Sequence, residues 1–235
     1  MRKQRVEGLD TFRGWAILFM VAYHFTYDLN HFNLISVNMD YALSFLISRY
    51  TIMSMFLVSV GVSLALVHQH GIKWTNIKKR IIQLGMASTL VTIATYIEFP
   101  HSWVYFGILH CILVASLIGL LFLPYPKVTL VSAILILVTS ATNTLSMEAL
   151  FQFMQPILNL PTYTEDLVPF VPWFAMVLIG IVLVQFKLHQ KLFNLSFFSN
   201  NSLLNRGLKF MGKHSLLIYL IHQPILFAGF MLFLK

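Results

Sequence analysis

The sequence predicts an all-α, polytopic integral membrane protein with about seven transmembrane helices and a cytoplasmic N-terminus. Three observations lead to this fold class: the composition, the length of the apolar runs and the placement of the basic residues. Of the 235 residues, 58% are hydrophobic and only 10% are charged, whereas soluble domains carry about 25% charged residues. The bilayer is therefore the main solvent of this chain.

Seven apolar runs approach the roughly 20 residues that a helix needs to cross a bilayer. They cover residues 14–34, 42–67, 81–98, 103–123, 128–145, 169–186 and 214–234. The runs are continuous and lack period-two alternation, which favours helices over a barrel. A short interfacial or re-entrant helix is expected at 147–158, and an amphipathic surface segment within 187–213.

The basic residues support this topology and indicate which side faces the cytoplasm. With the N-terminus inside, all but two of the 16 lysines and arginines fall on the cytoplasmic side, as the positive-inside rule requires. The exceptions are Arg49, within the second run, and Lys235 at the end. The net charge of +8 thus reflects topology and does not indicate nucleic acid. Without repeats or flexible linkers, we expect a single domain over residues 1–235, multi-pass in the plasma membrane.

The first helix carries most of the chemistry. Ionisable residues inside a span cost at least ~2.5 kcal/mol each and are functional candidates by default. Arg13 and His24 lie about three turns apart on one face, and His24, Asp28 and His31 follow at i, i+4 and i+7. A stripe of polar groups is therefore expected to run from the cytoplasmic edge into the outer half of the membrane.

His24 and Asp28 suit general-base catalysis, because a carboxylate one turn away can orient an imidazole and stabilise its protonated form. The structural alternative is a helix-packing hydrogen bond from His24. The spacing of His24, Asp28 and His31 also fits three metal ligands, but nothing else supports a metal, and we predict none. The single cysteine, Cys111, excludes an internal disulfide and multi-cysteine metal motifs.

Other helices bring polar groups to similar depth. Arg49 in the second run needs an anion, and Asp28 is the best candidate at that depth; a purely structural Asp28–Arg49 pair is the alternative. His110 is expected in the outer half of the fourth helix. His222 is expected near the midplane of the last helix, beside Gln223 and Pro224, where a structural hydrogen bond is again the alternative.

These residues also carry a resemblance to a known family. The stretch GLDTFRGWAILFMVAYHFTYDL (8–29) resembles the opening of the heparan-alpha-glucosaminide N-acetyltransferase catalytic domain and its short bacterial relatives. Three later blocks, at 106–121, 170–183 and 209–226, resemble the same family, so the likeness covers nearly the whole chain. The Arg13-x10-His24 spacing is also similar to the motif of the integral-membrane O-acyltransferases (acyltransferase family three), which belong to the same transmembrane acyltransferase group.

The resemblance implies transfer of an acyl group, expected to be acetyl, from cytoplasmic acetyl-CoA to a sugar amine or hydroxyl at the outer side. Together with the residue pattern of the first helix, it points to His24, Asp28 and His31 as the catalytic residues. The inner-edge residues Arg13, Lys79 and Arg80 are expected to bind the coenzyme A phosphates. Supporting positions on the acceptor side are Arg49, His110, Trp173 and His222.

One departure from the family leaves the catalytic histidine open. In the animal lysosomal members the position matching His24 is not histidine, and their catalytic histidine falls closer to His31. His24 as the base for direct transfer is our first choice, with His31 and an acyl-histidine intermediate as alternatives. The lysosomal acceptor is not carried over to this shorter chain.

The expected partners are acyl-CoA, a sugar or glycolipid acceptor and membrane lipid, with a homodimer left open. The competing function class is a transporter or proton-coupled carrier with an intramembrane His, Asp and Arg relay. The sequence lacks the paired or inverted halves that many carriers show. A scaffold whose buried charges only fix helix register is the third reading.

Overall fold

The computed structural model describes residues 6–39, 41–144, 147–164, 166–200 and 202–234, and the regular structure within these ranges is entirely helical. The all-α prediction is confirmed. Arg2, Lys3, Arg5 and Lys235, which entered the charge count, lie outside the described residues. The chain forms two compact units, one of Met1–Ser59 with His189–Lys235 and the other of Val60–Leu188. They are unit 1 and unit 2 below.

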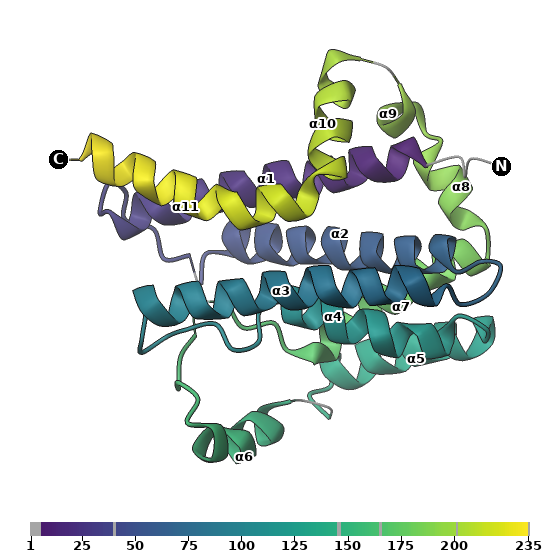
Figure 1. Ribbon diagram of the computed structural model, residues 1–235, viewed down its shortest axis with the longest axis horizontal. Coiled ribbons are helices and arrows are strands. Elements are labelled where there is room, and N and C mark those ends of the chain that lie inside the picture. The colour runs from purple at the N-terminus through teal and green to yellow at the C-terminus, as the bar shows by residue number, and fades with distance from the viewer. Residues whose placement is uncertain (1–5, 40, 145–146, 165, 201, 235) are drawn as a thin grey trace. The chain divides into compact units, whose positions relative to one another are not determined.

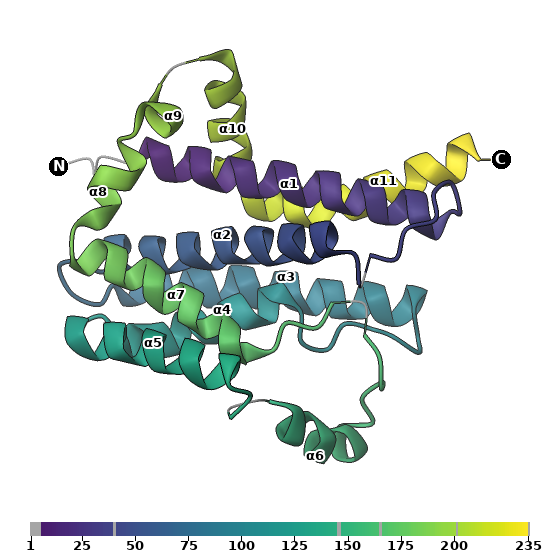
Figure 2. The ribbon, with the colours of Figure 1, turned by 180° about the vertical axis from the view of Figure 1, so that it is seen from behind.

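Unit 1 is built around two long helices, α1 (Glu7–His31) and α11 (Ser215–Phe233), which run alongside each other in Figures 1 and 2. The first part of α2 (Leu43–Val67) joins them. The unit is completed by the short helices α8 (Leu188–Phe193), α9 (Ser196–Ser199) and α10 (Leu203–Lys213). Ile17, Met20 and Ile52 form a buried apolar cluster, so this unit has a core of its own.

Close backbone contact fixes α10 against the first half of α1. A Cβ at Gly14 would overlap the backbone of Leu208, and a Cβ at Gly212 would overlap the backbone of Asp10. An ion pair adds to the contact, because Lys209 Nζ donates to Glu7 Oε2 at 2.7 Å. The predicted amphipathic segment is therefore helical in part, and one face of α10 is buried on α1 instead of lying free.

Unit 2 holds the rest of α2 together with the following helices: α3 (Trp74–Glu98), α4 (Ile108–Gly119), the 3₁₀ turn η1 (Leu120–Phe122), α5 (Pro126–Ala141), α6 (Glu148–Leu158) and α7 (Phe170–Gln185). α7 is its central helix: Val177, Leu178 and Ile181 are fully buried, and α7 packs on both α4 and α5. α6 stands apart from these helices in both views (Figures 1 and 2).

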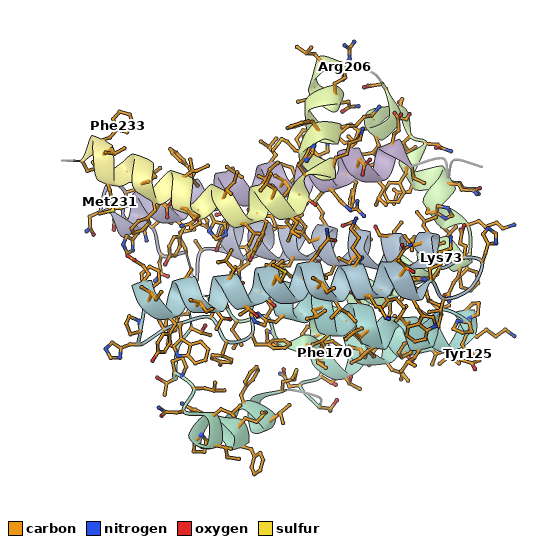
Figure 3. All side chains as sticks on the ribbon, in the orientation of Figure 1. Lys73, Tyr125, Phe170, Arg206, Met231 and Phe233 are labelled. Atoms are coloured by element: carbon orange, nitrogen blue, oxygen red, sulfur yellow. The ribbon has the colours of Figure 1, made fainter. Side chains whose placement is uncertain are left out.

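The end of α7 and the links before α3 and α5 lie at one end of unit 2. The Gln185 side chain, at the end of α7, donates to the carbonyls of Phe122 and Leu123 at 3.0 Å each. This ties the end of α7 to the turn before α5. Lys73 and Tyr125, which stand directly before α3 and α5, lie at this same end (Figure 3).

Three helices are long and apolar enough to cross a membrane: Leu43–His68, Trp74–Glu98 and Ser215–Phe233. Three more are apolar but shorter, Ile108–Phe122, Pro126–Ala141 and Phe170–Gln185. α1 has 25 residues but includes Glu7, Asp10, Arg13 and Asp28, which lower its hydropathy. The prediction of an all-helical chain with helices able to cross a membrane is confirmed, whereas the count of seven spans and the cytoplasmic N-terminus stay predictions.

Two local predictions can be compared directly. The helix expected at 147–158 is present as α6. The fourth run was predicted to be helical from residue 103, and this is wrong, because α4 begins at Ile108. The segment before α4 is instead hydrogen-bonded to a segment about 60 residues later. Thr164 Oγ1 donates to the Trp103 carbonyl at 2.9 Å, and the Val168 N–H donates to the Phe106 carbonyl at 3.1 Å.

Candidate functional site

Four polar side chains meet between α1 and α11 within unit 1, and we name His24, Asp28, His222 and Gln223 the α1–α11 polar cluster. The rings of His24 and His222 pack edge to face with their centroids 4.9 Å apart. Asp28 is fully buried, and its Oδ1 accepts a hydrogen bond from Gln223 Nε2 at 2.7 Å. Two neighbouring residues of α11 thus contact two residues of α1 that are one turn apart.

The hydrogen bond of His222 defines which ring nitrogen remains available. Its Nδ1 lies 2.7 Å from the Tyr219 carbonyl oxygen. A carbonyl oxygen only accepts, so Nδ1 carries the hydrogen, and Nε2 of the neutral ring has a free lone pair. The α11 backbone therefore fixes His222 in the tautomer whose Nε2 accepts.

Three buried atoms of the cluster have no hydrogen-bond partner among the described residues: Asp28 Oδ2, His222 Nε2 and Gln223 Oε1. Leaving a buried polar atom unpaired costs about 1–3 kcal/mol, so each one calls for an explanation. All three are acceptors when the carboxyl is ionised. The complementary group is therefore one that donates hydrogen bonds, such as an amine or a hydroxyl.

The proposed relay from Asp28 to His24 has a different geometry from the one expected. Asp28 forms its hydrogen bond with Gln223, and the neighbours of the His24 ring are aromatic: Tyr23, Tyr27 and His222, with centroids 4.9–6.4 Å away. A helical i, i+4 spacing brings two side chains near each other but does not decide which partner each one takes.

His31 lies one turn beyond Asp28 and is surrounded by aromatic rings. Its ring centroid is 5.4 Å from that of Phe227 and 6.4 Å from that of Tyr27, which it stacks on. The side chain is exposed. His31 is thus at the edge of the cluster, on the same α1–α11 seam, and can be reached from outside the unit.

Arg13 and Arg49, the two predicted site arginines of unit 1, have local partners. Arg13 Nη1 lies 3.5 Å from Asp10 Oδ1, one turn earlier in α1. The Arg49 guanidinium lies over the Tyr50 ring, 5.7 Å from its centroid, within the range of a cation–π contact. The anticipated Asp28–Arg49 ion pair is not among the ion pairs of the described residues.

His110 of unit 2 belongs to a hydrogen-bonded chain. The Gly107 N–H donates to His110 Nδ1 at 3.2 Å, His110 Nε2 lies 3.2 Å from Thr92 Oγ1, and Thr92 Oγ1 donates to the Val104 carbonyl at 2.8 Å. Since the Thr92 hydroxyl hydrogen is used on Val104, His110 Nε2 is the donor to Thr92. Both ring nitrogens are satisfied, and this ring holds the start of α4 against α3.

The remaining predicted residues lie in unit 2. Arg80 is half-buried, and its Nε donates to Ser116 Oγ on α4 at 2.9 Å, whereas Lys79 is exposed. Trp173 is half-buried in the first turn of α7. Among the described residues there is no group of three His, Cys, Asp or Glu side chains arranged to hold a metal ion.

The comparisons with known proteins identify the family. The family described as "Heparan-alpha-glucosaminide N-acetyltransferase, catalytic" matches residues 5–224. The chain belongs to this family. A search among curated proteins and a search among solved structures each returned no match.

Membership of the heparan-alpha-glucosaminide N-acetyltransferase family confirms the resemblance read from the sequence and indicates a membrane acetyltransferase. The α1–α11 polar cluster lies within the matched residues. Sequence reasoning named three of its members but missed the contact of Gln223 with Asp28. The signal available was that Gln223 is a polar residue directly after His222 in an apolar helix.

Proposed function

We propose that the chain is a membrane acyltransferase that moves an acetyl group from cytoplasmic acetyl-CoA to an amine or hydroxyl of a glycan or glycolipid at the outer side. His24 is the general base of this reaction. The family match supports acetyl transfer and favours an enzyme over a carrier. The donor, the acceptor and the roles of the residues are our proposal.

The observation that carries the proposal is the set of three unpaired buried acceptors in the α1–α11 polar cluster. An amine or hydroxyl nucleophile brings the N–H or O–H donors that these atoms lack. Burial also strengthens each such hydrogen bond relative to water. The cluster is therefore suited to hold the attacking group of the acceptor beside His24.

The reaction balances with one base. The acceptor nitrogen or oxygen attacks the thioester carbonyl carbon, and His24 removes the proton that this atom loses. The carbon–sulfur bond breaks, the coenzyme A thiolate leaves, and the proton on His24 returns to it as the thiol. Asp28 and His222 orient the nucleophile, and the charge of Asp28 favours the protonated state of His24 during transfer.

The donor side of the proposal concerns three basic residues, Arg13 of unit 1 and Lys79 and Arg80 of unit 2. Arginine and lysine are the side chains that bind phosphates through charge-assisted hydrogen bonds. Lys79 is exposed, and Arg13 and Arg80 are only partly buried. The pantetheine arm would then carry the thioester from the cytoplasmic side of the membrane toward His24.

The proposed topology has seven spans with the N-terminus in the cytoplasm. It is supported by unit 2, where Lys73 before α3, the start of α5 with Lys127 and the end of α7 lie at one end. The proposed membrane is the plasma membrane, and residues 1–235 are taken as one acyltransferase domain.

The test uses purified full-length protein in lipid nanodiscs with radiolabelled acetyl-CoA and a panel of amino sugars and neutral glycans. Wild type should transfer label to at least one acceptor, and His24→Ala should lower the rate by 10²-fold or more, the usual contribution of a general base. His101→Ala, at an exposed histidine of a loop, is the matched control and should keep the rate.

Full transfer by His24→Ala would retire His24 as the base, and loss on His31→Ala instead would assign the role to His31. Absence of label transfer by the wild type to every acceptor, together with no binding of acetyl-CoA, would reject the acyltransferase proposal. Arg13→Ala should weaken acetyl-CoA binding while its melting temperature stays near that of the wild type.

A further inference from the structure

Unit 2 contains a cavity that the acyl-transfer site does not use. It has a volume of about 430 Å³ and lies between the end of α5, the helix α6, the link that follows α6 and the loop residue Tyr105. This volume is within the range of about 300–1,000 Å³ that is typical of small-molecule sites.

Of the 14 residues that line the cavity, six carry uncharged polar side chains and eight are apolar. The six polar residues are Tyr105, Ser140, Asn143, Gln152, Gln155 and Thr162. No described residue that lines it is charged. Tyr105 and Phe151 add aromatic surface, with their rings packed edge to face at 5.8 Å.

The two faces of α6 are reversed relative to a helix of a soluble protein. Its apolar residues at i, i+3, i+4 and i+7, which are Leu150, Phe153, Met154 and Ile157, are exposed, Phe153 by 68% and Ile157 by 63%. Its glutamines line the cavity. Such an arrangement is the one expected of a helix whose apolar stripe is covered by lipid.

The lining selects the chemistry of the occupant. The Tyr105 hydroxyl and the Gln155 amide form no hydrogen bond with the described residues, so an apolar occupant would leave them unpaired, at about 1–3 kcal/mol each. A charged occupant would meet no opposite charge among the described lining residues. A hydroxyl both donates and accepts, as an amide side chain does, and aromatic rings suit the apolar face of a sugar ring.

We propose that this cavity is a binding site for an uncharged carbohydrate unit, held by Gln155 and Tyr105 and closed on one side by α6. The two sources of such a unit are a free saccharide and the head group of a glycolipid whose tail lies in the bilayer beside α6. The site does not depend on the acyltransferase proposal, because sugar binding requires neither acetyl-CoA nor His24.

The test measures binding of tritiated maltose, a neutral disaccharide, to the full chain in phosphatidylcholine nanodiscs prepared without glycoside detergent. Saturable binding is expected, and dodecyl maltoside, which carries the same head group on an alkyl chain, should compete for it. Tighter competition by dodecyl maltoside than by maltose indicates a glycolipid source, and equal competition indicates a free saccharide. Glucosamine and glucuronate should compete at least tenfold more weakly.

Two variants and a matched control connect the binding to the cavity. Gln155→Leu should weaken maltose binding at least tenfold, and Tyr105→Phe, which keeps the ring, should weaken it several-fold. Gln83→Leu, at an exposed glutamine of α3, should leave it within twofold. Melting temperatures of all three should stay near that of the wild type, which shows that they fold.

Absence of saturable maltose binding, binding unchanged by Gln155→Leu and Tyr105→Phe, or equal binding of the charged sugars would each overturn the proposed site. Acetyl transfer is assayed separately with His24→Ala. Maltose binding without acetyl transfer would support the sugar site and reject the acyltransferase proposal. Acetyl transfer without maltose binding would support the acyltransferase proposal and reject the sugar site.

Discussion

At the scale of single residues, the contact between Asp28 and Gln223 is the one that fixes the α1–α11 polar cluster. Asp28→Leu would leave Gln223 Nε2 without its acceptor, so the free energy of unfolding should fall by about 1–3 kcal/mol. Asp28→Asn keeps an oxygen in that place and should unfold at or above the wild-type temperature. Thermal unfolding in nanodiscs checks both variants.

A double-mutant cycle makes this prediction specific to the pair. Asp28→Leu with Gln223→Leu removes both partners, so the combined loss should be smaller than the sum of the two single losses by about 0.5–3 kcal/mol. Strict additivity would show that the two side chains do not interact in the folded protein.

His110 is predicted to stabilise the fold and not to act on a substrate, because both of its ring nitrogens are already bonded. Thr92→Val leaves His110 Nε2 and the Val104 carbonyl without a partner and should cost about 1–3 kcal/mol of stability. Thr139→Val is the control, since that hydroxyl bonds only to carbonyls of its own helix. The acetyl-transfer rate per folded molecule should be the same in Thr92→Val as in the wild type. A lower rate in fully folded Thr92→Val would indicate that His110 takes part in the reaction.

The same residues show how far the sequence reaches. His24, Asp28 and His31 could be placed on one face from helical spacing alone, because that spacing is a local property. Similar depth in the membrane suggested Arg49 as the partner of Asp28. Two residues at the same depth can still face different directions, because depth does not determine how each helix is rotated about its axis. The observed partner, Gln223, is 195 positions away along the chain and follows only from how α11 packs on α1.

At the scale of elements, the glycines of α10 provide a matched pair. Gly212→Ala places a methyl group on the Asp10 backbone, so α10 must move off α1, and the protein should be destabilised by about 1–3 kcal/mol. A Cβ at Gly207 meets nothing within 4 Å, and Gly207→Ala should instead stabilise the helix by up to about 1 kcal/mol. Chemical denaturation of the two variants measures both signs.

The same contact predicts a dependence on pH. The hydrogen bond and charge of Lys209 lower the pKa of Glu7 from its ordinary value of 4.5. A lowered pKa in the folded state stabilises the fold above pH 4.5, and this contribution is lost as the pH falls through the folded value. Glu7 is 65% exposed, so solvent limits the effect to about 1 kcal/mol or less.

Glu7→Gln should therefore be less stable than wild type at pH 7, and the difference in stability should shrink as the pH falls below 4.5. Melting curves from pH 7 to below pH 4.5 test it, with Glu98→Gln at another exposed carboxylate as control. A constant difference at every pH would show that the carboxylate contributes by packing and not by charge.

Helix positions followed from apolar run length, whereas helix starts did not. The run at 103 continues without a break into α4 in the sequence, yet Trp103 and Phe106 are bonded to residues about 60 positions later. Asp166 Oδ2 then accepts from the Ile108 N–H at 3.1 Å, which satisfies one of the free amides at a helix start. These hydrogen bonds join residues far apart in the sequence, so a hydropathy profile cannot predict them.

At the scale of the whole molecule, the number of spans decides which links share a side of the membrane. If only the three longest apolar helices cross, residues 99–214 all lie on one side, so His101 and Lys127 share it. If seven helices cross, His101 and Lys127 lie on opposite sides, and Lys127 shares a side with Lys73. The two topologies can therefore be distinguished by whether His101 and Lys127 lie on the same side of the membrane.

Single cysteines introduced into a Cys111→Ala background show on which side of the membrane each position lies. Cys111 is the only cysteine and is buried, so its removal clears the background. For the seven-span, N-inside topology, His101→Cys should react with a membrane-impermeant maleimide in intact cells. Lys73→Cys and Lys127→Cys should react only after permeabilisation. Labelling of Lys127→Cys in intact cells alongside His101→Cys would reject seven spans, and with them the placement of Lys79 and Arg80 with Arg13 on the coenzyme A side.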